Sequence, residues 1–227
     1  MNPISDQLNA MEPKPVVDAQ SMNSSSEWRD YGKFLLKLAL FVFILRSFIM
    51  SPFNIPSESM QPRLLIGDYL LVAKWPYGYS KFSLPFSLPL IPGRIFASEP
   101  KQGDVVVFKA PKTDGVDYIK RVIGMPGDSV SYRDNQLTVN GMPVVYEPVG
   151  EYVGKGPGAD MTGASEIRET LDGRTHSVLE ITHLPGVDQG EGDWTVPAGQ
   201  YLVMGDNRDR SDDGRFWGYL PEERLRG

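Results

Sequence analysis

The stretch that decides the fold is DYIKRVIGMPGDSVSYRDNQLTVNG, residues 117–141. It consists of short runs of β-branched and aromatic residues, separated by turn signals such as Gly-Asp and Asp-Asn. The segment DNQLTVNGMPV, which begins at Asp134, has the pattern of a tight hairpin. Similar short runs lie at 64–72, 103–110 and 200–206. Together they predict a domain that is mainly β, a barrel or a coiled pair of sheets.

Composition narrows the class of protein. The chain has 227 residues, and its 23 glycines and 19 prolines favour turns and β-structure over a helix bundle. A formal net charge of −6 argues against nucleic acid as the main partner. The chain has no cysteine, which excludes thiol catalysis, thiolate metal sites and disulfides.

The N-terminal part predicts a membrane anchor. Residues 1–31 are polar and predict a disordered tail. Residues 34–50, FLLKLALFVFILRSFIM, are apolar on every face of a helix, so we expect a single transmembrane helix at 32–50. The alternatives are a buried helix and a cleaved signal peptide. The long, acid-containing region before the run and the lack of a small-x-small site favour an uncleaved anchor.

Basic residues around this run predict its orientation. Arg29 and Lys33 precede it, and Arg63 is the only basic residue in the twenty positions after residue 50. The positive-inside rule then places the tail in the cytoplasm and residues 51–227 outside it.

Two later segments differ in composition from the rest. Residues 69–98 contain no acid and are rich in aromatic and basic residues. This composition suits a membrane interface, and a Pro-rich surface loop is the alternative. Residues 150–195 are rich in Gly, Asp and Thr and predict an insertion of unassigned role.

A pair of serines, Ser57 and Ser59, lies between two prolines just after the apolar run. A linking loop would explain them without chemistry, whereas a nucleophilic serine needs a base. The chain has only two histidines, His176 and His183, in a stretch that predicts a β-strand. Lysine is the other base that activates serine in enzymes.

Lys120 is the candidate lysine. Strand alternation puts it on one face with Tyr118 and Val122, and it puts Arg121 on the other face with Ile119. A free lysine has a pKa of about 10.4, so a base that works near neutrality needs a shift of roughly three units, about 4 kcal/mol. Burial among apolar groups can supply that shift. Taken alone, the segment favours a strand with two solvated basic residues.

The third charged stretch is GDNRDRSDDGRFWG, residues 205–218. Its spacing partly matches a calcium loop that begins at Asp209, but the twelfth position, where a glutamate is expected, is Leu220. The stretch therefore predicts no metal site but a conformationally fixed turn with paired Asp and Arg side chains.

Taken together, four stretches resemble those of the bacterial type I signal peptidases, the membrane-bound Ser/Lys endopeptidases. They occur in the family's order and cover about a third of the chain. They are RSFIMSPFNIPSESMQPRLLIGDYLLV (46–72), KQGDVVVFK (101–109), DYIKRVIGMPGDSV (117–130) and GDNRDRSDDGRFWG (205–218).

The resemblance implies a role for each matching residue. Ser59 matches the nucleophile and Lys120 the general base, while the Ser57 hydroxyl and the Ser59 N–H match the oxyanion hole. Ser211 matches the hydroxyl that orients the lysine. Supporting residues are Arg121 beside the base and the ionic pairs Asp213–Arg215 and Asp206–Arg208. The small side chains that precede the cleavage site are expected in a shallow pocket lined by Phe53, Ile55, Leu64, Tyr118 and Ile119.

The resemblance also implies the setting. It implies coiled antiparallel sheets that form a partly open, barrel-like catalytic domain, no cofactor, preproteins and the lipid bilayer as partners, and a bacterial inner-membrane location. One alternative is a related Ser/Lys peptidase with a narrow substrate, such as a conjugative pilin. Another is an inactive, membrane-anchored β-domain that binds envelope partners. Glu58 stands where some relatives have glycine, and we expect its side chain to point to solvent.

Overall fold

A computed structural model of the chain describes residues 24–84, 87–112, 115–181 and 188–227. The chain divides into two compact units, Met1–Phe41 and Val42–Gly227. Helix α1 (Ser24–Ile44) begins within the segment for which the sequence predicts disorder. Glu27 in its first turn suits a helix N-terminus, where the backbone dipole favours negative charge. In the described part of the chain, no helix combines the length and the apolar character that a membrane crossing requires.

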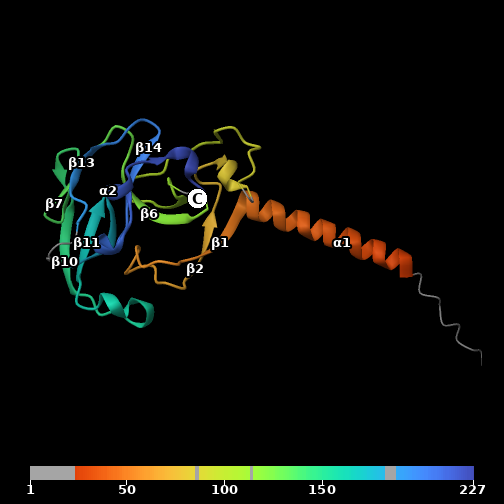
Figure 1. The fold of residues 1–227 in the computed structure, drawn as a ribbon, viewed down its shortest axis with the longest axis horizontal. Coiled ribbons are helices and arrows are strands. Elements are labelled where there is room, and N and C mark those ends of the chain that lie inside the picture. The colour runs from red at the N-terminus through yellow and green to blue at the C-terminus, as the bar shows by residue number, and fades with distance from the viewer. Residues whose placement is uncertain (1–23, 85–86, 113–114, 182–187) are drawn as a thin grey trace, which may run out of the picture. The chain divides into compact units, whose positions relative to one another are not determined.

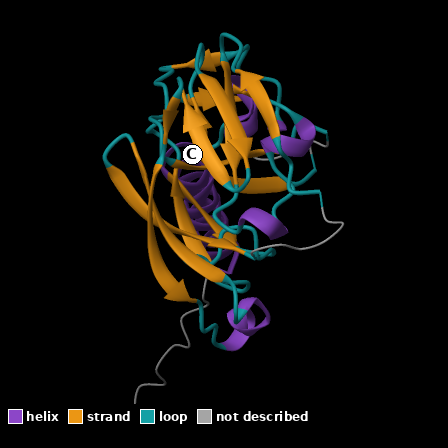
Figure 2. Cartoon of the chain, turned by 90° about the vertical axis from the view of Figure 1, so that its left-hand side faces the viewer, coloured by secondary structure: helices purple, strands orange, loops and turns teal. Residues whose placement is uncertain are grey.

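The second unit is mainly β, as the sequence predicts (Figure 2). Its described strands form five small antiparallel sheets, none of which closes into a barrel. The strands are β1 (Met50–Asn54), β2 (Tyr69–Ala73), β3 (Tyr79–Ser80), β4 (Arg94–Ile95), β5 (Val105–Lys109), β6 (Asp117–Gly124), β7 (Ser129–Arg133), β8 (Gln136–Val139), β9 (Met142–Pro143), β10 (Val145–Glu151), β11 (Ser165–Leu171), β12 (Arg174–Glu180), β13 (Gly192–Thr195), β14 (Gln200–Met204) and β15 (Leu220–Pro221). The short helices are η1 (Leu45–Ile49), η2 (Lys81–Ser83), η4 (Gly156–Met161), η5 (Arg208–Arg210), α2 (Gly214–Trp217) and η6 (Glu222–Arg224).

The predicted hairpin is present as β7 and β8. Asp134 and Asn135 form its turn with φ values of 48° and 60°. These left-handed values are the ones that Asp and Asn tolerate better than most residues, and they match the twist of the flanking strands. The hairpin sheet has the order β13-β7-β8-β9.

Strand β6 lies in the central sheet, whose order is β15-β14-β6-β5 (Figure 1). Side chains on both of its faces are buried, because the strand packs between two apolar clusters. Ile123 belongs to the cluster that contains Tyr132, and Val122 to the cluster that contains Phe108. Both faces therefore meet a core, a point that alternation alone leaves open.

The predicted insertion supplies β11, β12 and the end of β10 to the three-stranded sheet β10-β11-β12. Asp172 and Gly173 turn the chain between β11 and β12, with φ values of 46° and 72°. The outer edge of β12 reaches the third charged stretch, because Leu179 forms a parallel bridge with Asn207. Residues 182–187 of the predicted insertion, which include His183, lie outside the described residues.

Candidate active site

The two serines lie in the turn between β1 and β2. Backbone hydrogen bonds from Ile55 N to Asp68 O (2.9 Å) and from Gly67 N to Ile55 O (2.9 Å) close the base of this turn. Met60 is buried in an apolar cluster with Ile55 and side chains of β5 and β6. Met60 thereby fixes the turn against the strand that carries Lys120, and its neighbour Ser59 is held at that strand.

Lys120 and Ser59 are in direct contact. Lys120 Nζ lies 2.6 Å from Ser59 Oγ, within hydrogen-bond distance. Both residues are almost fully buried, with 4% and 3% of their surface exposed. The structure thus joins two residues that stand 61 positions apart in the sequence.

Burial lowers the pKa of Lys120 to about 8. The charged ammonium loses hydration inside the protein, and the Arg215 guanidinium adds to this effect. The carboxylates of Asp213 and Asp212 act in the opposite direction, and burial outweighs them. A substantial fraction of the Lys120 side chains is therefore neutral at mildly alkaline pH and able to accept a proton.

A second buried lysine provides an internal comparison. Lys74 is 1% exposed, and burial also lowers its pKa to about 8. Its Nζ donates to the backbone oxygen of Ser83 (2.5 Å). Burial alone therefore does not distinguish a base in this protein, whereas contact with a serine hydroxyl does.

Ser57 and Ser211 differ in how they meet these two residues. Ser57 Oγ is exposed and lies 3.3 Å from Ser59 Oγ. Ser211 Oγ is buried and makes no hydrogen bond with Lys120, so the expected contact is not made; the hydroxyl helps to lower the pKa of the Asp213 carboxyl. The hydroxyl packs instead against Gly205, where a side chain would collide with both Ser211 and the Ser59 carbonyl. The orienting role of Ser211 stays a prediction.

Two adjoining cavities lie beside the turn that carries the serines. One, of about 490 Å³, has Ser57, Ser59 and Lys120 in its wall. The other, of about 260 Å³, is lined by four of the five residues expected in the substrate pocket, namely Phe53, Ile55, Tyr118 and Ile119. Tyr118 and Ile119 line both cavities. The fifth residue, Leu64, packs instead against the apolar cluster that contains Met60.

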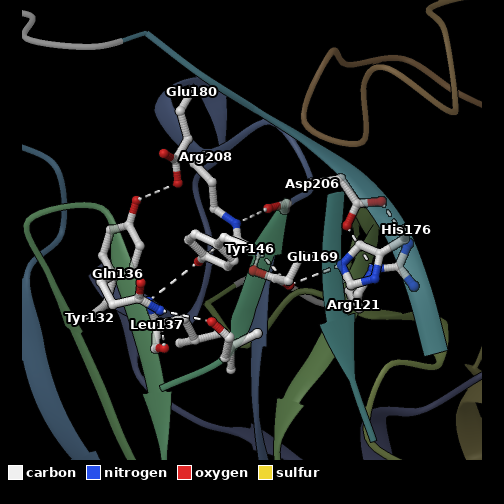
Figure 3. A network of polar contacts seen from close by, with 12 residues as sticks. Arg121, Tyr132, Gln136, Leu137, Tyr146, Glu169, His176, Glu180, Asp206 and Arg208 are labelled. Carbon is white, nitrogen blue, oxygen red and sulfur yellow. Dashed lines mark hydrogen bonds and ion pairs between the residues drawn. The ribbon is translucent and has the colours of Figure 1, made fainter. Parts of the chain in front are cut away.

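The supporting ionic pairs differ in part from the expectation. Arg215 Nε donates to Asp213 Oδ1 at 2.9 Å, as expected. Asp206, however, pairs with Arg121 through two hydrogen bonds of 2.7 Å (Figure 3). The expected Asp206–Arg208 pair is therefore wrong, because the Asp206 carboxylate is already occupied by the arginine of β6.

Arg208 finds its partner in the insertion. Its Nη2 donates to both carboxylate oxygens of Glu169 on β11, at 2.8 and 2.7 Å, and both side chains are fully buried. His176 on β12 approaches the same carboxylate, with Nε2 3.0 Å from Oε1 (Figure 3). Burial by itself raises the pKa of Glu169, but Arg208 and His176 outweigh it and lower the pKa to about 2. Sequence reasoning missed Glu169, although the Asp-Gly turn fixes a register that sets it opposite His176.

Glu58 does not point freely to solvent. It pairs with Arg210 at 3.2 Å, and Arg210 also pairs with Asp160 of η4 at 2.7 Å. Glu58 and Arg210 both border the cavity that contains Ser59. The expectation of a solvent-directed side chain fails because η5 brings Arg210 beside Glu58 and the insertion brings Asp160 to the same arginine.

Comparisons with known proteins agree on one family. The family model described as "Signal peptidase, peptidase S26" matches residues 28–227. A signal peptidase I of Rickettsia typhi is 39% identical over 203 residues, which cover 86% of this chain and 74% of the relative. A signal peptidase I of Pseudomonas aeruginosa is 37% identical over 208 residues, which cover 91% and 68%. A crystal structure of a signal peptidase I from Enterococcus faecalis is 29% identical, with a TM-score of 0.35 over 57% of this chain and 96% of that chain.

Proposed function

The chain belongs to the signal peptidases of peptidase family S26, and on that premise we propose that it removes signal peptides from preproteins with Ser59 as nucleophile and Lys120 as general base. The observation that carries the proposal is the 2.6 Å contact between Lys120 Nζ and Ser59 Oγ in a buried site. A serine hydroxyl becomes a competent nucleophile when a neutral base takes its proton.

The proposed reaction runs in two steps. Neutral Lys120 accepts the Ser59 proton while Oγ attacks the scissile carbonyl, and the lysine then gives the proton to the leaving amine of the mature chain. A water molecule next attacks the acyl-enzyme while Lys120 accepts a proton from it and returns that proton to Ser59 Oγ as the ester bond breaks. The signal peptide leaves as a carboxylic acid, which loses its own proton to solvent. The Ser57 hydroxyl and the Ser59 N–H are proposed to bind the oxyanion in both steps.

The substrate is proposed to bind as an extended strand beside the two cavities. The smaller cavity has mostly apolar residues in its wall, Phe53 and Ile55 among them, and is proposed to accept small side chains. This fits a cleavage site that is preceded by small residues.

The pH dependence of cleavage tests the proposed base. Because the neutral form of Lys120 is the active one and its pKa is about 8, the single-turnover rate on a purified preprotein should rise with pH up to that value and then level off. Well below pH 8 the rate should fall about tenfold per pH unit. A rate that is flat between about pH 6 and about pH 9 would contradict a lysine base. The N-terminus of the product, read by mass spectrometry, confirms the cut site.

Membrane attachment through residues 32–50 is also part of the proposal, with the catalytic unit on the periplasmic or external face. The support is the apolar run itself and exposed apolar side chains on the catalytic unit, including Tyr69 (82% exposed), Leu71 (71%) and Phe96 (85%). We expect the full chain to stay with the membrane fraction after alkaline carbonate washing. Quantitative release by that treatment would contradict an integral anchor.

A further inference from the structure

The segment 205–208 lies between the insertion and the turn that carries Ser59. On one side, Leu179 N of β12 donates to Asp206 O at 2.9 Å. On the other side, Asn207 N donates to Ser59 O at 3.1 Å. The insertion is therefore connected to the proposed nucleophile by a short series of backbone hydrogen bonds.

The side chain of Asn207 contacts the peptide bond that joins Glu58 to Ser59. Its Nδ2 donates to the backbone oxygen of Glu58 at 3.3 Å, and the residue is fully buried. The Glu58 carbonyl and the Ser59 N–H belong to the same planar peptide and point in opposite directions. The carbonyl accepts from Gln61 N (3.0 Å) as well as from Asn207, and together these hydrogen bonds fix the direction of the Ser59 N–H, which is the proposed oxyanion donor.

Arg208, the residue that follows Asn207, is held by several buried hydrogen bonds. Its guanidinium donates to Glu169, to Gly205 O (3.2 Å) and to the Tyr146 hydroxyl (3.2 Å). Its own backbone oxygen accepts from Arg215 (2.5 Å). Without the Glu169 carboxylate, a cation would remain buried and unpaired, and the chain around Asn207 would move to relieve it.

We propose that Asn207 is a positioning residue, which aims the Ser59 N–H at the oxyanion, and that Glu169 of the insertion holds Asn207 in place through Arg208. This inference rests on the proposed function, because it assumes that Ser59 is the nucleophile. It gives residues 150–195 a role in catalysis that needs no contact with the substrate. Figure 3 shows His176 directed toward Glu169, the insertion residue that pairs with Arg208.

The test compares three variants of the full chain on a preprotein: Asn207→Ala, Glu169→Gln and Glu147→Gln. Removing an oxyanion donor typically lowers kcat by about 10²–10³-fold, so a misdirected donor should cost about 10–100-fold. We expect that loss in kcat for Asn207→Ala and about tenfold for Glu169→Gln, with KM within about twofold of the wild type. Glu147 is the matched control, because its pair with Arg168 lies in the same sheet as Glu169, β10-β11-β12, but is exposed. Glu147→Gln should cleave at the wild-type rate.

A second readout separates positioning from general loosening of the fold. A peptide aldehyde that forms a tetrahedral adduct with Ser59 depends on the oxyanion hole, whereas the matching peptide alcohol does not. Asn207→Ala should weaken the aldehyde by the same factor as kcat and leave the alcohol unchanged. Each variant is assayed below its own melting temperature. If Glu169→Gln does not fold, Asn207→Ala decides the outcome, because the Asn207→Ala variant keeps the buried Arg208–Glu169 pair.

The outcomes are distinct for the two proposals. If the wild type does not cleave a preprotein, the proposed function fails. If the wild type cleaves and Asn207→Ala retains its kcat and its aldehyde affinity, the positioning role is refuted. A loss for Asn207→Ala that is equal for aldehyde and alcohol would also refute it, since that pattern indicates a damaged pocket.

Discussion

Lys120→Met is expected to reduce the single-turnover cleavage of a preprotein by about 10⁴-fold or more, and Ser59→Ala by a similar factor. The two residues form one functional unit, with Nζ and Oγ 2.6 Å apart, so either deletion removes the activated nucleophile. Lys120→Arg should be equally inactive, because a guanidinium keeps its proton at every pH at which proteins fold. The measurement is quenched-flow cleavage at about pH 8.5, with circular dichroism to show that each variant is folded.

The matched control is Lys74→Met. Lys74 is as buried as Lys120 and has its pKa lowered to the same value of about 8, but it donates to a backbone oxygen. This variant should retain cleavage within a few-fold of the wild type. Substantial cleavage by Lys120→Met, or a loss for Lys74→Met as large as that for Lys120→Met, would overturn the assignment of the base.

Arg121→Met is expected to lower the free energy of unfolding by about 3–5 kcal/mol. Arg121 and Asp206 are 4% and 1% exposed and share two hydrogen bonds, so removing the cation leaves a buried carboxylate without its counter-charge. The Arg121→Met/Asp206→Leu double variant should recover most of this loss, because it removes both charges together. Urea unfolding followed by tryptophan fluorescence measures all of these values.

Arg168→Met provides the comparison for that experiment. Its partner Glu147 is mostly exposed, and solvent-exposed pairs contribute only about 0–1 kcal/mol. A destabilisation by Arg121→Met no larger than that of Arg168→Met would show that the Arg121–Asp206 pair does not support the fold.

The local parts of the fold follow from the sequence because their causes are local. Asp134 and Asn135 can adopt positive φ, so the hairpin β7–β8 can be predicted from the sequence alone. Alternation places Lys120 and Arg121 on opposite faces of one strand, and the structure shows them in different polar contacts. The contact between Lys120 and Ser59 has no local cause, because it depends on how a turn distant in the sequence packs against β6. Only the resemblance to a known family predicted it.

Ion pairs are also hard to predict from the sequence when their partners lie on different strands. Asp213 and Arg215 pair locally, since Asp213 accepts a hydrogen bond from Arg215 N at the start of α2 and its side chain lies beside that arginine. Asp206 and Arg208 have the same spacing, but Asp206 precedes η5 and Arg208 begins it, and each pairs with a residue of a different strand. Spacing in the sequence therefore identifies the charged residues, while the tertiary fold decides which of them pair.

Strand β6 carries the proposed base and a structural arginine side by side, and this makes its register indispensable. A slip of one residue in one direction would present the Arg121 guanidinium to Ser59, and a slip in the other direction would present the Lys120 amine to Asp206. The guanidinium could not give up its proton, and the amine could not reproduce the two-point contact with the carboxylate. Gly124 at the end of the strand resists such a slip, because its neighbours leave no room there for any side chain. Insertions or deletions in this strand should thus be lethal to both chemistry and folding, whereas length changes in the surrounding loops need not be.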